Sequence, residues 1–343
     1  MTTAILGPMA SGGVASALGK AAAHPASASQ ARRYAGVVES IGGTPVVEIA
    51  RLSPNPAVRL FAKLEAANPT GSVKDRVARA LVEDLEASGR LNPDSILLEA
   101  TSGNTGIALA MIGRRKGYRV AVVMPDNVTL ERRALIALHG AEVIDSPGAL
   151  GSNGAIALAR DLVARDPRFV MADQYANPAN HRVHEETTGP EILDAVPELD
   201  VFVAGLGTGG TLTGVGRFLR RAKPGVRIIA AEPLPGEAVQ GLRSLDDGFV
   251  PEVFDPTLLH DRYVVSNRDA VATARELLDR EGIFAGPSSG AILSVAARVA
   301  STMDAGTIVA LLPDGGWKYL SAGTYDRPLD DLDEALEGGV SWW

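Results

Sequence analysis

The sequence contains no cysteine, and this absence excludes several kinds of chemistry at once. Disulfides, Cys-ligated zinc, iron–sulfur clusters and thiol nucleophiles are all ruled out for this chain of 343 residues. Its five histidines are too scattered to indicate a metal site, so no metal is expected. No apolar run approaches the roughly 20 residues of a membrane span. The net charge of −8 disfavours nucleic acid and anionic membranes as partners, because both require clustered Lys and Arg. We expect a cytoplasmic protein.

The two ends of the chain differ from the rest in composition. Residues 1–33 are rich in Ala, Ser and Gly, and the first acidic residue is Glu39. Such a segment buries too little apolar surface to offset its ordering entropy, so we expect a disordered leader. A transit peptide, or a gene start placed too early with Met9 as the true start, are the alternatives. Residues 332–343 end in Ser-Trp-Trp; they are a candidate active-site lid or, alternatively, a frayed tail.

From residue 34 onward, apolar runs alternate with helical segments. Strands are predicted at 59–64, 95–99, 119–124, 201–204, 226–231 and 307–311. Helices are predicted at 73–88, 105–116, 130–139, 153–164, 211–221, 270–280 and 291–300. Continuous apolar strands are typical of parallel sheets covered on both faces. The sequence therefore predicts an α/β protein with two doubly wound, mainly parallel sheet domains, hinged near 174–180.

A glycine-rich loop at 205–210 fits the G-x-G-x-x-G pattern of dinucleotide-binding proteins. It follows a predicted strand, opens a helix, and precedes Glu232, which could bind a ribose hydroxyl. A nicotinamide-dependent oxidoreductase is therefore one hypothesis. The hydroxyls of Thr208 and Thr211 weaken it, because hydroxyls and backbone N–H groups at a helix start together suit a terminal phosphate monoester.

Three further loops carry groups that suit an amino-acid substrate and an amine-reactive cofactor. Lys74 begins a predicted helix, where the macrodipole lowers an ammonium pKa; a solvated surface lysine is the alternative. The loop 101–106 offers neutral donors for a carboxylate, although an ordinary helix cap is possible. Ser288 lies in a third loop and could also be a cap. A phosphate, a carboxylate and an amine-reactive group in one cleft indicate pyridoxal phosphate with an amino-acid substrate.

At these residues the sequence resembles the fold-type II pyridoxal-phosphate enzymes, which share a tryptophan synthase β-like fold, and specifically the cysteine synthases. The resemblance covers residue 34 to the C-terminus. Its matching segments are 41–45, 68–76, 101–106, 124–126, 174–180, 187–191, 205–211 and 282–291. It implies a larger cofactor-phosphate domain of residues 34–65 and 180–331, and a smaller, mobile domain of residues 66–179 that carries Lys74 and the substrate loop.

The resemblance also implies a role for each matching residue. Lys74 would bind the cofactor covalently, Asn104 would meet its ring hydroxyl oxygen, and Ser288 its pyridine nitrogen. The phosphate would lie in a cup formed by Gly207, Thr208, Gly209, Gly210 and Thr211. The substrate carboxylate would be held by Thr101, Ser102, Thr105 and Gln174. In this chemistry Lys74 removes the Cα proton, the β-substituent leaves, and a sulfur nucleophile adds at Cβ.

The segment 232–251 resembles O-phosphoserine sulfhydrylases of the cysteine synthase B branch, where an arginine at the Arg243 position receives the substrate phosphate. Segment 316–323 fits the same branch, whose sulfur donor can be a small thiocarboxylated carrier protein. An O-acetylserine-using cysteine synthase with sulfide or thiosulfate is the alternative, with Arg243 paired to Asp246 or Asp247 on the surface. The family expectation is a homodimer.

Three further classes are weaker hypotheses. A serine or threonine dehydratase would share the fold and the lysine, but Gln174 and the Arg243 segment argue against it. Nothing in the sequence resembles the haem or regulatory domain of a cystathionine-forming enzyme. A non-enzymatic amino-acid sensor would not need Lys74, Ser288 and the phosphate cup together.

Overall fold

The computed structural model describes residues 33–101 and 103–331, so the predictions for the leader and for residues 332–343 lie outside the described residues, apart from Arg33. Both sheets belong to the compact unit Gly36–Trp343. The strands are β1 (Val46–Glu48), β2 (Val58–Leu64), β3 (Ile96–Ala100), β4 (Arg119–Pro125), β5 (Glu142–Ser146), β6 (Phe169–Met171), β7 (Val201–Gly205), β8 (Arg227–Pro233), β9 (Asp261–Val265) and β10 (Gly306–Leu312). The α-helices are α1 (Lys74–Ala87), α2 (Asn104–Lys116), α3 (Leu130–Leu138), α4 (Gly151–Arg165), α5 (Ala179–Val183), α6 (Gly189–Ala195), α7 (Gly210–Ala222), α8 (Asn267–Glu281) and α9 (Pro287–Thr302).

The strands form two sheets that are parallel except at one edge. The larger sheet has the order β1-β2-β10-β7-β8-β9, and only β1 pairs antiparallel. The smaller sheet has the order β5-β4-β3-β6 and is parallel throughout. The prediction of an α/β protein with two mainly parallel sheets is confirmed. The exact domain boundaries stay a prediction.

All six predicted strands are present, and the four that the sequence analysis missed are the edge strands β1, β5, β6 and β9. An edge strand has one neighbour and is less covered, so its residues need not form a continuous apolar run. The alternating burial of β9 and the largely accessible residues of β5 show this directly. The missed helices α5 and α6 are short, with five and seven residues.

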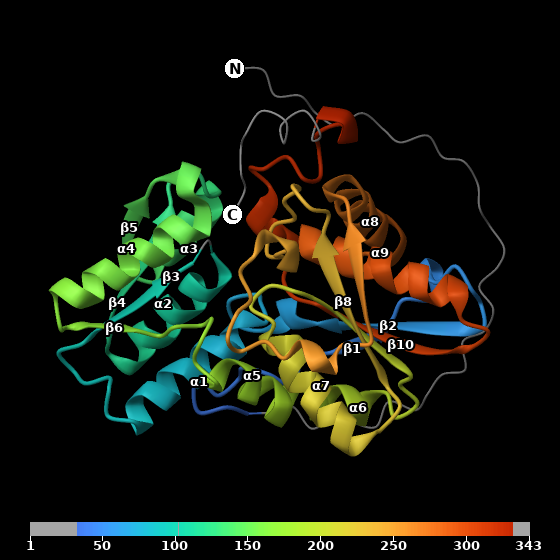
Figure 1. Cartoon of the computed structure of the whole chain (residues 1–343), viewed down its shortest axis with the longest axis horizontal. Coiled ribbons are helices and arrows are strands. Elements are labelled where there is room, and N and C mark those ends of the chain that lie inside the picture. Colours follow the sequence, from blue (N-terminus) through green and yellow to red (C-terminus); the bar gives the residue numbers. More distant parts are fainter. Residues whose placement is uncertain (1–32, 102, 332–343) are drawn as a thin grey trace. The chain divides into compact units, whose positions relative to one another are not determined.

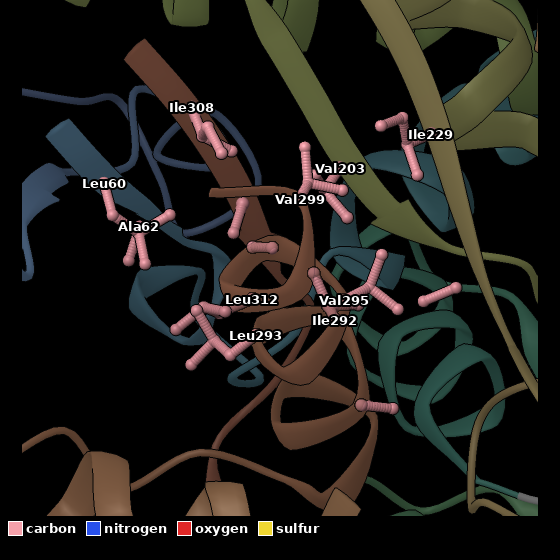
Figure 2. Close-up of a cluster of buried hydrophobic side chains, with 14 of the residues drawn as sticks. Leu60, Ala62, Val203, Ile229, Ile292, Leu293, Val295, Val299, Ile308 and Leu312 are labelled. Atoms are coloured by element: carbon pink, nitrogen blue, oxygen red, sulfur yellow. The ribbon is translucent and has the colours of Figure 1, made fainter. Parts of the chain in front are cut away.

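The larger sheet buries a separate core on each face. Val201 and Val203 of β7 pack with α9 in one cluster, whereas Phe202 and Ala204 pack with α7 in another. Figure 1 accordingly shows α8 and α9 on one side of this sheet and α6 and α7 on the other. Figure 2 shows the first cluster, in which side chains of α9 lie against β2, β7, β8 and β10. This two-sided burial explains why the central strands are apolar at most positions.

The smaller sheet follows the same rule. Leu97 of β3 packs with α1 and α2, while Ile96 and Leu98 pack with α4. Between strand and helix, β3 leads into α2 and β7 leads into α7 through short loops. The loops at the carboxyl ends of parallel strands carry the groups considered next.

Candidate active site

One cavity brings together most of the residues that the sequence analysis selected. Its lining includes nine of them: Lys74, Thr101, Asn104, Thr105, Gln174, Gly207, Thr208, Arg243 and Ser288. Gly209, Gly210 and Thr211 follow directly, where α7 begins. Ser102 lies outside the described residues. The lining also contains residues that the sequence analysis did not select, among them Arg132, Tyr175, Asp314 and Tyr319.

Lys74 is the first residue of α1 and is half-buried in the cavity wall. Burial lowers the pKa of its ammonium group, and the nearby carboxylate of Asp314 opposes that shift. A lowered pKa increases the fraction of free amine, which is the form that attacks a carbonyl carbon or accepts a proton. Lys74 is therefore not a solvated surface lysine.

Asn104 belongs to a buried hydrogen-bonded cluster that also contains Asp314, Lys318 and Tyr319. The Nδ2 group of Asn104 donates to Oδ2 of Asp314 at 2.7 Å, and Nζ of Lys318 donates to Oδ1 of Asn104 at 2.7 Å. The hydroxyl of Tyr319 donates to the same Asp314 oxygen at 2.6 Å. None of the last three residues was predicted as a site residue, because no local pattern links segment 313–319 to the start of α2.

Two of the predicted carboxylate-binding residues form a direct pair. Oγ1 of Thr105 donates to Oε1 of Gln174 at 2.7 Å. Beneath them, the fully buried carboxyl of Glu99 accepts from the backbone N–H groups of Gln174 at 3.1 Å and Ala100 at 3.0 Å. Burial raises the pKa of Glu99 to about 8, although those N–H groups oppose the shift. Helix α2 has Gly103 at its N-cap, and the N–H of Gly103 donates to Oγ1 of Thr101 at 3.2 Å.

The loop before α7 has little space for a side chain at Gly207, Gly209 and Gly210. Gly209 has a φ of 79°, and a Cβ there would lie 2.5 Å from Phe254. A Cβ on Gly210 would lie 2.0 Å from Oδ1 of Asn180. Nδ2 of Asn180 donates to Oγ1 of Thr208 at 3.0 Å and to the carbonyl oxygen of Gln174 at 2.6 Å. Asn180 thus joins the glycine loop to the substrate loop, a role that the sequence analysis missed.

Arg243 lies in an aromatic cluster with Tyr175 and Phe249. Its guanidinium carbon is 5.1 Å from the Tyr175 ring centre and 4.8 Å from that of Phe249. The two rings meet edge to face, with centroids 5.7 Å apart. Among the described side chains, Arg243 forms no ion pair with Asp246, and the side chain of Asp247 is outside the description. The cation is therefore held by ring faces and by a side-chain hydrogen bond with Tyr175, and neither neutralises its charge.

The contacts of Ser288 and Glu232 bear on one alternative interpretation of each residue. Ser288 is buried at the start of α9, whose N-cap is Gly286 with no side-chain cap bond, so Ser288 is not a cap. The buried carboxylate of Glu232 accepts from the Leu245 N–H at 3.0 Å and contacts Arg262 at 3.3 Å. Glu232 therefore fixes the backbone at Leu245, two residues after Arg243. A carboxylate that binds a ribose hydroxyl would instead face an open site.

Comparison with known proteins identifies the class. Residues 37–314 match the family described as pyridoxal-phosphate dependent enzyme, so the chain belongs to this family and its cofactor is pyridoxal phosphate. Within the family it is a cysteine synthase-type enzyme. It is 42% identical over 288 residues to cysteine synthase B of Escherichia coli (strain K12), which covers 84% of this chain and 95% of that relative. Cysteine synthase B of Salmonella typhimurium (strain LT2) matches with the same identity and coverage.

Solved structures extend the comparison. An O-ureido-L-serine synthase has a TM-score of 0.81 and 41% identity, covering 89% of this chain and 100% of that one. A cysteine synthase of Entamoeba histolytica has a TM-score of 0.82 and 34% identity, covering 90% and 97%. The family assignment excludes the nicotinamide-dependent oxidoreductase suggested by residues 205–210.

The residues present fit the cofactor. A phosphate requires a backbone that can approach closely, and Gly207, Gly209 and Gly210 supply it, because a Cβ at each would lie within 3 Å of another group. A covalent link requires an amine, and Lys74 lines the same cavity as Thr208 and Ser288.

Among the described helices, none is long and apolar enough to cross a membrane.

Proposed function

We propose that this enzyme makes L-cysteine from O-phospho-L-serine by β-replacement, with sulfide or a small thiocarboxylated sulfur-carrier protein as the sulfur donor. The C–O bond at Cβ breaks and inorganic phosphate leaves. A C–S bond to the sulfur nucleophile then forms at the same carbon. With sulfide this gives cysteine directly, whereas with a thiocarboxylated carrier the bond between the sulfur and the acyl carbon of the carrier must afterwards be hydrolysed to release cysteine. The observation that carries this proposal is the position of Arg243, which lines the cavity of Lys74 and is not paired with Asp246.

The substrate preference follows from the charge of the leaving group. A phosphate dianion can accept two hydrogen bonds from a guanidinium fork, whereas an acetyl ester offers no charge. One charged hydrogen bond is worth roughly 1.5–3 kcal/mol, which corresponds to a selectivity of about 10- to 150-fold. This range favours phosphoserine without excluding acetylserine as a slower substrate.

The proposed roles assign each part of the reaction to the cavity residues. Pyridoxal phosphate, when bound, supplies an electron sink for bond breaking at Cα of the substrate. Lys74 would hold it covalently, with Asn104 at its ring oxygen and Ser288 at its ring nitrogen. The loop of Gly207 to Thr211 would hold its phosphate. After release by the substrate amine, Lys74 would take the Cα proton and return it once sulfur has added.

The substrate carboxylate would be bound by the neutral donors of the α2 loop. Thr101, Thr105 and Gln174 line the cavity, and the last two are already in contact. Ser102 would contribute from the same loop. Neutral donors at a helix start suit a carboxylate because they need no counter-charge.

Several finer features belong to the same proposal. We infer a homodimer in the cytoplasm, with residues 66–179 as a smaller, mobile domain and residues 34–65 with 180–331 as the larger one. The alternative function is an O-acetylserine-using cysteine synthase. The similarity to cysteine synthase B relatives supports it as well as it supports O-phosphoserine use.

A spectral titration distinguishes the two substrates. Purified holoenzyme would be titrated with O-phosphoserine and, in parallel, with O-acetylserine, while the visible band of the bound cofactor is recorded. We expect the band to change at lower O-phosphoserine concentration, and Arg243→Ala to remove that preference. The same change at lower O-acetylserine would overturn phosphoserine specificity and leave the β-replacement chemistry intact. A matched variant, Arg217→Ala, removes an arginine that pairs with Asp255 at 3.7 Å and should retain the preference.

A further inference from the structure

A second lysine lies next to the cavity and has no part in the proposed reaction. Lys318 is on the 3₁₀ turn η7 (Gly316–Tyr319) and is fully buried. Its Nζ donates to Oδ1 of Asn104 at 2.7 Å and to the carbonyl oxygen of Gly71 at 3.1 Å. Burying an ammonium group costs free energy unless its N–H groups find acceptors, and these two contacts supply acceptors. A lysine buried at this cost next to the cavity suggests a role for it there.

The contacts of Asn104 permit one orientation of its amide. Lys318 can only donate a hydrogen bond, so it must face Oδ1. The carboxylate of Asp314 can only accept, so it must face Nδ2, which lies at 2.7 Å. One N–H of the amide is used in this way, and the second remains for an acceptor in the cavity that Asn104 lines. If the amide were flipped, its NH2 group would face the Lys318 ammonium and its oxygen would face the Asp314 carboxylate, so neither hydrogen bond could form.

Charges on both sides of the amide make this orientation stable. Asp314 is almost fully buried and also accepts from the hydroxyl of Tyr319 at 2.6 Å. Burial lowers the pKa of Lys318, while Asp314 and Asp75 oppose that shift and Arg132 adds to it. The positive charge of Lys318 and the negative charge of Asp314 therefore lie at opposite ends of the neutral Asn104 amide, and each lowers the cost of burying the other.

Lys318 also reaches the loop that carries the other cofactor ligand. Gly71 lies three residues before Lys74, and its carbonyl oxygen accepts both from Nζ of Lys318 and from the Gly315 N–H at 3.3 Å. The Val73 N–H donates to the carbonyl of Pro313 at 2.8 Å. The start of α1 and the start of α2 are therefore both attached to segment 313–319.

We propose that Lys318 is a positioning residue for the cofactor. It orients the amide of Asn104 so that its free N–H meets the ring oxygen of pyridoxal phosphate, and it ties that amide to the Lys74 loop through Gly71. The proposal rests on the Asn104–cofactor contact proposed above. It is independent of which activated serine the enzyme uses.

A double-mutant cycle tests this role through cofactor binding, without turnover. The dissociation constant of pyridoxal phosphate and the visible absorption maximum would be measured for the wild type, Lys318→Met, Asn104→Ala and the double variant. Loss of one charged hydrogen bond predicts about a 10-fold weaker affinity for each single variant. Both should shift the absorption maximum in the same direction, and the double variant should bind no more weakly than Asn104→Ala. Lys318→Arg, which retains the charge and a donor, should recover the wild-type maximum.

The control is Lys116→Met, which removes a lysine from the other end of α2, where it pairs with Glu86 at 2.6 Å. It should change neither quantity. The proposal would be overturned if Lys318→Met weakened pyridoxal phosphate binding equally in the wild type and in the Asn104→Ala variant. It would also be overturned if Lys318→Met did not weaken binding at all. An ineffective Asn104→Ala would refute the Asn104 contact as well. If Lys318→Met does not fold, the same cycle is run with Lys318→Met and Asp314→Asn combined, since this leaves neither charge unpaired.

Discussion

The hydrogen-bonded cluster around Asn104 and the aromatic cluster around Arg243 hold polar groups at the same cavity in different ways. In the first, Lys318 and Asp314 satisfy the Asn104 amide at both ends, each at 2.7 Å. In the second, the guanidinium carbon of Arg243 lies 5.1 and 4.8 Å from the centres of two rings, which attract the cation without neutralising its charge. The hydrogen bonds fix the orientation of the Asn104 amide, whereas the ring faces restrict where the Arg243 guanidinium lies.

This difference matches what each cluster has to bind. A cofactor presents the same atoms in every cycle, so a cluster fixed by directional hydrogen bonds suits it. A substrate leaving group must enter and depart, so a cation with unneutralised charge suits it better. Three predictions test this division, in order of decreasing effect.

The largest effect is expected from Lys74→Ala, which removes the covalent link and leaves both clusters intact. The visible band of the bound cofactor should disappear, and the rate of cysteine formation should fall by at least about 100-fold, because the base is lost with the link. Absorbance spectra and a cysteine assay measure the two effects. A variant that keeps both the band and the rate would refute the assignment of Lys74. Lys223→Ala, at the C-terminal end of α7, is the matched control.

An intermediate effect is expected from Glu99, which supports Gln174 beside the aromatic cluster. Its folded-state pKa of about 8 lies above the unfolded value of 4.5, so the folded protein binds more protons between these values and loses stability as pH rises through them. Asp75, with a pKa of about 6, and His184, whose pKa lies well below 6.5, titrate below this range, whereas burial raises the pKa values of Tyr319 and Tyr325, which titrate above it. From pH 6.5 to 8 the free energy of unfolding should fall by up to about 2 kcal/mol.

Urea denaturation of cofactor-free protein at several pH values measures this fall, and Glu99→Gln should flatten it. The matched control is Glu86→Gln, a surface acid that pairs with Lys116. Parallel curves for the wild type and Glu99→Gln would show that Glu99 is not the titrating group.

The smallest effect is expected from Phe249→Leu, which removes one ring from Arg243 while keeping an apolar side chain. An exposed cation–π contact is worth about 0.5–1 kcal/mol, so the KM for O-phosphoserine should rise by roughly 2- to 5-fold. The KM for O-acetylserine should not change. Phe61→Leu, which removes the ring 4.7 Å from Arg59, is the matched control. Equal changes for both substrates would mean that Phe249 shapes the cavity rather than positioning Arg243.

Much of the fold could be predicted because the central strands are buried on both faces. The runs that became β3, β4, β7 and β10 are apolar at nearly every position, and this pattern is readable locally. The edge strand β5, with the sequence EVIDS, is mostly accessible and carries no such signal. The glycine loop before α7 was also predictable, because close backbone approach excludes other residues there.

The selection of Lys74, Asn104, Thr208 and Ser288 also came from the sequence, through the loops that precede helices. The structure corrects one of these loops: the segment before Ser288 joins α8 to α9 rather than a strand to a helix. Lys318 and Asp314 could not be found in this way. Lys318 contacts Asn104 across 214 positions of sequence, and Asp314 contacts it across 210. Lys318 and Asp314 come close to Asn104 only when β10, which precedes them in the chain, has paired with β2 and β7 in the larger sheet.

The amino-acid sequence alone therefore specified the central strands, the helices that cover them, and the loops whose residues define the family. These depend on apolar periodicity and backbone requirements within a few residues. Tertiary packing was needed to place Arg243 against two rings, to set Glu99 beneath Gln174, and to bring a buried lysine to Asn104. Polar contacts of this kind depend on distances between segments far apart in the chain, and the packing of both sheets sets those distances.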